Sequence, residues 1–194
     1  MNDLILKLYS SSQTVFQIEE IAQMFPDVSP NNLTRRLHYF VSVAKIKNPR
    51  RGIYTKMEYL PFELANKIFT PSYISFETVL LKEGIVFQYY ETIFVASYLS
   101  RTLTVDNHAI CYRQIGDHAL YNRSGIEEKN GYFIATKERA FLDAVFLYKD
   151  YYFDNLGSLD WEKIFKLEPV YQSKALFKRV KNYHKHFKEE YGAK

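Results

Sequence analysis

The chain has 194 residues, of which 47% are hydrophobic and 17% aromatic, so it can bury a packed core and is not a disordered polar chain. No stretch approaches the roughly 20 consecutive apolar residues that a transmembrane helix needs, and the first residues lack the pattern of a secretory signal. We therefore expect a cytoplasmic protein of one or two small domains without membrane contact. The single cysteine, Cys111, excludes an intramolecular disulfide and is expected to be a small buried hydrophobe.

The net charge of +4 is unevenly distributed along the chain. Residues 28–57 contain seven basic residues and no acidic one, a local excess that is typical of a protein with a polyanionic partner. Residues 173–194 are also basic, with seven basic residues against two acidic ones. For this tail we favour a solvated helix face over a second nucleic-acid contact.

Residues 1–57 show the pattern of a winged helix-turn-helix domain. Apolar spacing predicts short helices over residues 3–9 and 18–25, and Ser29-Pro30 predicts the start of a third, with the serine side chain as N-cap acceptor. Residues 45–47 and 53–55 alternate as two strands around a turn at residues 48–52 with arginines at its tip. This order of elements predicts DNA binding. The alternative is a three-helix scaffold that packs on another protein.

The exposed face of the third helix and the wing supply the predicted DNA contacts. Asparagine and arginine near the start of a recognition helix can pair with adenine and guanine, so Arg35 is the main candidate for base recognition. Alternatively, Arg35 binds a phosphate and the asparagines satisfy free amides of the helix start. The wing arginines are expected on phosphates or in a narrow minor groove. The predicted contact residues are Asn31, Asn32, Arg35, Arg36, Tyr39, Lys47, Arg50 and Arg51.

Residues 58–194 predict a second domain, which makes the whole chain an α+β protein. Helical patterns cover residues 61–69, a helix after residues 71–75 that stops at Gly84, and three later segments at 136–148, 161–167 and 174–189. Between them, short runs rich in β-branched and aromatic residues predict an antiparallel sheet flanked by helices. The expected strands cover residues 85–90, 92–98, 103–105, 109–115 and 132–134.

No catalytic or metal-binding motif is found in the sequence. The five histidines have no metal-ligand spacing, and the seven glycines form no phosphate-binding loop. Ser72 and Ser75 are interpreted as helix caps and Asp143 as a polar position on a helix. We therefore expect no catalytic residues, no metal and no cofactor in this chain.

Two segments resemble the AbiEi-type antitoxins. TPSYISFETVL at residues 70–80 resembles the family's P-S-Y-I-S-x-x-S-A-L helix, and ATKERAFLD at residues 135–143 resembles its A-T-x-E-[KR]-A-L-L-D segment. The wing ending R-G-I-Y is similar to the family's G-x-Y strand. The similarity extends to about Lys149, with departures at Thr78, Val79 and Phe141. The motif residues that it singles out are Tyr73, Ser75, Glu138, Arg139 and Asp143.

The resemblance implies an antitoxin of a type IV toxin–antitoxin pair linked to abortive phage infection. Its partner would be a nucleotidyltransferase-like toxin encoded beside it, neutralised without a stable complex and with the C-terminal domain required. The winged helix would bind inverted repeats in double-stranded DNA and repress the operon.

Two other classes of function remain open from the sequence. The 17 tyrosines and 15 phenylalanines allow a winged-helix regulator whose C-terminal domain senses a small molecule. The third class is an enzyme acting on nucleic acid or on the toxin, which a cofactor or metal dependence would reveal.

Overall fold

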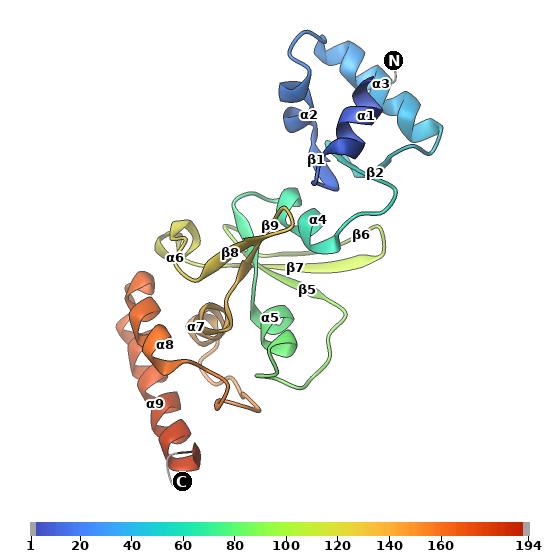
Figure 1. The fold of residues 1–194 in the computed structure, drawn as a ribbon. Helices are drawn as coiled ribbons and strands as arrows, with labels where there is room; N and C mark the ends of the chain where they lie inside the picture. The colour runs from blue at the N-terminus through green and yellow to red at the C-terminus, as the bar shows by residue number, and fades with distance from the viewer. Residues whose placement is uncertain (1–2, 192–194) are drawn as a thin grey trace.

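The computed structural model describes residues 3–191 and has the expected α+β architecture (Figure 1). Residues 1–2 and 192–194, the outer ends of the two expected domains, lie outside the described residues. A three-stranded sheet belongs to the N-terminal region and a six-stranded sheet to the C-terminal region. Within residues 3–191, none of the helices has the length and apolar character required to cross a membrane.

The N-terminal region has three helices and a small antiparallel sheet in the order of a winged helix. Leu8, Ile21, Leu33 and Leu37 from the three helices are fully buried and form its core. Between the first two helices lies a strand that the sequence did not predict. The following strand covers Lys47–Arg50 instead of residues 45–47, so the turn shrinks to Arg51 and Gly52. The elements are α1 (Asp3–Ser10), β1 (Val15–Gln17), α2 (Ile18–Met24), α3 (Pro30–Ser42), β2 (Lys47–Arg50) and β3 (Ile53–Thr55).

The C-terminal region contains the expected helices but departs from several expected strands. Ser72–Ile74, the segment before the expected helix, is a strand that the sequence did not predict, and residues 85–90 form no strand. A short helix and the strand that follows it at Ile126–Lys129 were not predicted. The elements are α4 (Pro61–Ile68), β4 (Ser72–Ile74), α5 (Phe76–Lys82), β5 (Ile93–Ser97), β6 (Arg101–Val105), β7 (His108–Gln114), α6 (Asp117–Tyr121), β8 (Ile126–Lys129), β9 (Tyr132–Ala135), α7 (Lys137–Leu147), α8 (Trp161–Leu167), a 3-10 turn at Glu168–Tyr171 and α9 (Lys174–Tyr191).

The six-stranded sheet is mixed, so the expected antiparallel sheet is wrong in part. Its strand order is β6-β7-β5-β4-β9-β8, and the pairs β5–β7 and β4–β9 are parallel. Each parallel pair is joined by a long connection, which contains β6 between β5 and β7 and the elements from α5 to β8 between β4 and β9. Helices α5 and α7 lie on one side of the sheet, while α4 lies between the other side and the N-terminal region (Figure 1).

The N-terminal sheet packs directly on the C-terminal region. Val15 and Ile53 of the small sheet share a buried cluster with Leu64 of α4 and Val105 of β6. Because hydrophobic burial and polar contacts both cross this junction, the two regions form a joined unit rather than two domains on a free linker.

Polar contacts reinforce the same junction. The buried Glu63 carboxylate accepts hydrogen bonds from the Thr14 backbone amide at 2.9 Å and the Thr14 hydroxyl at 2.5 Å. Lys67 Nζ lies 2.6 Å from Glu20 Oε1, and the Gln17 side-chain amide donates to the Lys67 backbone carbonyl at 2.8 Å. These contacts fix α4 against the start of α2.

Candidate nucleic-acid interface

Helix α3 presents the polar face that the sequence predicts for DNA. Leu33, Leu37 and Phe40 are buried against α1 and α2, which leaves the opposite side of the helix to solvent. Pro30 occupies the first turn, where its missing amide hydrogen costs nothing. Ser29 is the N-cap residue as expected, but among the described residues its side chain makes no capping hydrogen bond.

Four of the five α3 residues predicted to contact DNA gather in one place. Asn32, Arg35, Arg36 and Tyr39 line a shallow depression of about 500 Å³. Arg35 Nη2 donates to Asn32 Oδ1 at 2.5 Å, so these two side chains are positioned as a pair. Asn31 is exposed but does not line the depression. An amide and two guanidinium groups on one helix face offer donors for base edges and phosphates.

The wing residues are placed differently from the expectation. Lys47 Nζ lies 3.4 Å from Asp106 Oδ2, and the Arg50 guanidinium lies 5.4 Å from the centre of the Phe69 ring. Both basic groups therefore contact the C-terminal region, and Arg50 does not project from the tip. Gly52, at φ +79°, closes the turn and accepts a hydrogen bond from the Ile18 amide at 2.9 Å. Arg51 remains the exposed arginine at this turn.

Four of the residues in the antitoxin-like motifs form a buried cluster. Ser75 Oγ donates to Asp143 Oδ2 at 2.6 Å, and Tyr73 Oη donates to Asp143 Oδ1 at 3.1 Å. Arg139 Nε lies 3.5 Å from Asp143 Oδ1 and also donates to Tyr73 Oη at 3.3 Å. Tyr171 completes the cluster with a 2.5 Å hydrogen bond to Asp143 Oδ1. Ser75 is the N-cap residue of α5 as expected, but its side chain makes no capping hydrogen bond and binds Asp143 instead. Asp143 is a polar residue on a helix as expected, but it is fully buried.

Arg139 ties this cluster to the neighbouring loop. Its Nη1 donates to the Ser124 carbonyl at 3.1 Å and its Nη2 to the Ala119 carbonyl at 2.5 Å. A buried guanidinium has five donors to satisfy, and one carbonyl within α6 and one after it accept from two of them. The cluster thus joins β4, α7, α6 and the 3-10 turn.

Burial governs the electrostatics of the cluster. Burial raises the pKa of the Asp143 carboxyl. The Arg139 guanidinium and three hydroxyl donors lower it, because they favour the carboxylate, but the effect of burial is larger. Burial would lower the pKa of Arg139, but the Asp143 carboxylate, Tyr171 and Tyr73 together outweigh it and the pKa is raised, so the guanidinium stays charged. Burial also raises the pKa values of Tyr73 and Tyr171, which remain neutral donors. With Arg139 and Asp143 fully buried, neither can touch a partner directly.

The remaining chemical candidates lie apart from this cluster. Glu138 is buried beside α8, where its carboxylate accepts a hydrogen bond from the Asp160 amide at 3.4 Å. Cys111 is half-buried rather than buried as expected, and Thr102 Oγ1 donates to its sulfur at 3.5 Å. Within residues 3–191, no three or more His, Cys, Asp or Glu side chains are grouped so that they could hold a metal ion.

Sequence reasoning missed Tyr171 as a member of the buried cluster. A tyrosine in a segment without motif or strong helical period gives no local signal of a contact with Asp143, because that contact depends on the tertiary fold.

Comparison with protein-family models and with curated protein sequences finds no match to the chain.

Proposed function

We propose that this protein binds double-stranded DNA through α3 and acts as the regulator and antitoxin of a type IV toxin–antitoxin operon. The observation that supports DNA binding is the exposed face of Asn32, Arg35, Arg36 and Tyr39 on a helix that follows a helix-turn-helix pattern. That face lies within a segment of the chain without acidic residues, so nothing on it repels a phosphate backbone.

Support for the antitoxin role comes from the two motif segments. Residues 70–80 and 135–143 resemble the AbiEi-type pattern, and the cluster around Asp143 brings their polar side chains together. The shared residues thus define the interior of the C-terminal region. The toxin would be a nucleotidyltransferase-like enzyme encoded nearby, and the inverted repeats of the operon would be the DNA target.

DNA recognition is tested with Arg35→Ala and the charge-matched control Lys163→Ala on α8, which lies outside the α3 face. Binding to the upstream DNA of the operon and to scrambled DNA is measured at one salt concentration. Loss of one two-point arginine–guanine contact weakens operator binding by about 1–3 kcal/mol and leaves scrambled DNA less affected. An equal loss on both sequences would instead make Arg35 a phosphate contact, and no loss on either contradicts DNA binding through α3.

Antitoxicity is tested by co-expressing the full chain with the adjacent toxin gene from an independent promoter. The double variant Arg35→Ala/Arg36→Ala is expected to lose operator binding and still restore growth, because neutralisation is assigned to the C-terminal region. The full chain is used because α4 packs on β1, so a fragment starting at residue 58 would expose that surface. Failure of the unaltered chain to restore growth contradicts the antitoxin role.

A further inference from the structure

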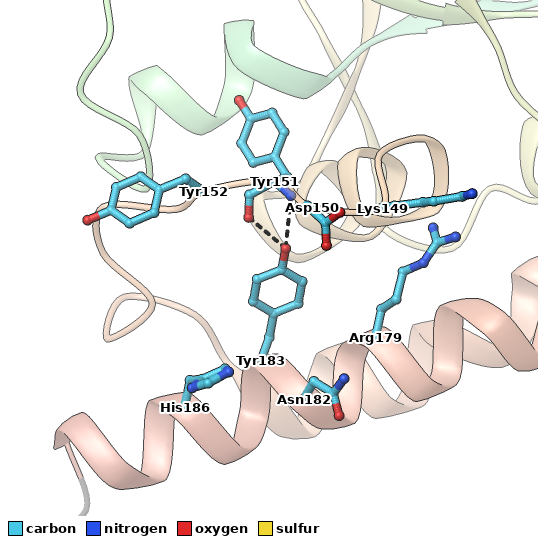
Figure 2. Close-up of a pocket in the computed structure, with 8 residues that line it drawn as sticks. All are labelled: Lys149, Asp150, Tyr151, Tyr152, Arg179, Asn182, Tyr183 and His186. Atoms are coloured by element: carbon cyan, nitrogen blue, oxygen red, sulfur yellow. Dashed lines mark hydrogen bonds between the residues drawn. The ribbon is translucent and has the colours of Figure 1, made fainter.

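A cleft lies where the loop after α7 meets α9, at the end of the molecule remote from α3 (Figures 1 and 2). Its volume is about 390 Å³, within the range of roughly 300–1,000 Å³ that small-molecule pockets occupy. The lining residues are Lys149, Asp150, Tyr151, Tyr152, Arg179, Asn182, Tyr183 and His186.

Hydrogen bonds between the two walls hold this cleft in shape. Tyr183 Oη donates to the Tyr151 carbonyl at 2.6 Å and accepts from the Tyr151 amide at 3.1 Å (Figure 2). Arg179 Nη1 donates to the carbonyls of Val145 at 2.7 Å and Phe146 at 3.1 Å, at the end of α7. A site already fixed in this way loses little conformational entropy when a ligand binds.

One end of the cleft is cationic. Lys149 comes from the loop and Arg179 from α9, and in the view of Figure 2 both side chains lie on the side of the cleft opposite Tyr152. Among residues 3–191, Lys149 has no ion-pair partner, and Arg179 uses only Nη1 in hydrogen bonds to protein. Asp150 is the one acidic residue in the lining. Two cations with spare donors suit an anion with several oxygen atoms, such as a phosphate group.

The other end of the cleft is aromatic. Tyr152 is 80% exposed and lies at the opposite end from Lys149 (Figure 2). Such an exposed ring offers a stacking surface for a planar group.

We propose that this cleft binds a small molecule that combines a planar aromatic ring with a phosphate group, the chemistry of a mononucleotide. The ring stacks on Tyr152 and the phosphate lies between Lys149 and Arg179. This proposal requires neither DNA binding by α3 nor toxin neutralisation, so its test is independent of the proposed function.

The test is isothermal titration of the full chain with the four ribonucleoside 5′-monophosphates, the matching nucleosides and inorganic phosphate. At least one nucleotide is expected to bind about tenfold or more tightly than its nucleoside, because the phosphate adds charge-assisted hydrogen bonds. Inorganic phosphate alone is expected to bind more weakly than that nucleotide, because it has no ring to stack.

Two variants assign the binding to this cleft. Lys149→Ala is expected to weaken the nucleotide about tenfold and leave the nucleoside unchanged, whereas Tyr152→Ala weakens both by about tenfold. Both residues are exposed, so neither change removes a buried contact, and Lys163→Ala on α8 serves as the control of equal charge. Absence of binding by all four nucleotides at millimolar concentration overturns the proposal. So does nucleotide binding that neither variant weakens.

Discussion

Asp143 shows how a single residue can hold several elements of the C-terminal region together. Its carboxylate accepts hydrogen bonds from Ser75 and Tyr73 of the β4 segment and from Tyr171 of the 3-10 turn. Arg139, one helical turn earlier on α7, supplies the opposite charge. Removal of one member of such a buried pair is costly because the remaining charge keeps its desolvation penalty without compensation.

We therefore expect Arg139→Met to reduce the free energy of unfolding by about 3–5 kcal/mol. Lys163→Met, on a side chain that is 66% exposed, is the control and should change stability by less than about 0.5 kcal/mol. Urea unfolding followed by circular dichroism measures both. A loss below about 1 kcal/mol in Arg139→Met would mean that the cluster does not depend on its ion pair.

At the scale of elements, the wing differs from its expected role as a free hairpin. The basic groups of Lys47 and Arg50 contact Asp106 and Phe69, so only Arg51 keeps an exposed position at the turn. The partly exposed Arg50 thus places its guanidinium over an aromatic face of the C-terminal region.

The two wing arginines should therefore respond differently to substitution. Arg51→Ala is expected to lower the salt dependence of DNA binding by about one unit of slope, as for one lost phosphate contact. Arg50→Ala should leave that slope unchanged and lower stability by about 0.5–1 kcal/mol, because it loses a cation–π contact. Binding titrations across a salt series measure the slopes. A reduced slope in Arg50→Ala alone would place DNA on the opposite side of the wing.

Sequence periodicity predicted helices well and strands less well. A helix such as α3 follows from apolar spacing, because one of its faces packs on the core whatever the topology. The strand β4 is only three residues long, and its place between β5 and β9 depends on pairing with residues distant in sequence. The α3 face was predictable because it is local, whereas the cluster around Asp143 was not, because it joins three separate segments.

At the scale of the whole molecule, the junction between the small sheet and α4 links α3 to the C-terminal region. Glu63 is fully buried there and accepts two hydrogen bonds from Thr14, while Lys67 pairs with Glu20. The contacts come from both sides of the expected boundary near residue 58, so unfolding of the two regions should be coupled.

Glu63→Ala is expected to destabilise the protein by about 1–3 kcal/mol, because the Thr14 amide and hydroxyl lose their acceptor in a buried setting. We expect the unaltered chain to unfold in a single calorimetric transition, which a weakened junction should broaden or divide. Glu58→Ala, on an exposed side chain, provides the control. If Glu63→Ala unfolds like the unaltered chain, the junction contributes little to coupling.

The mixed sheet also constrains how the chain can fold while it is being synthesised. Ile74 of β4 pairs with Ile134 of β9, and Asp143 obtains its donor from Tyr171 still later in the chain. Before residue 171 leaves the ribosome, the carboxylate lacks its closest hydroxyl, and β4 has no partner on one edge until β9 emerges. Such long-range closure is slow and leaves apolar strands exposed meanwhile. Completion of the C-terminal region thus follows the synthesis of residue 171, after residues 3–55 have already emerged.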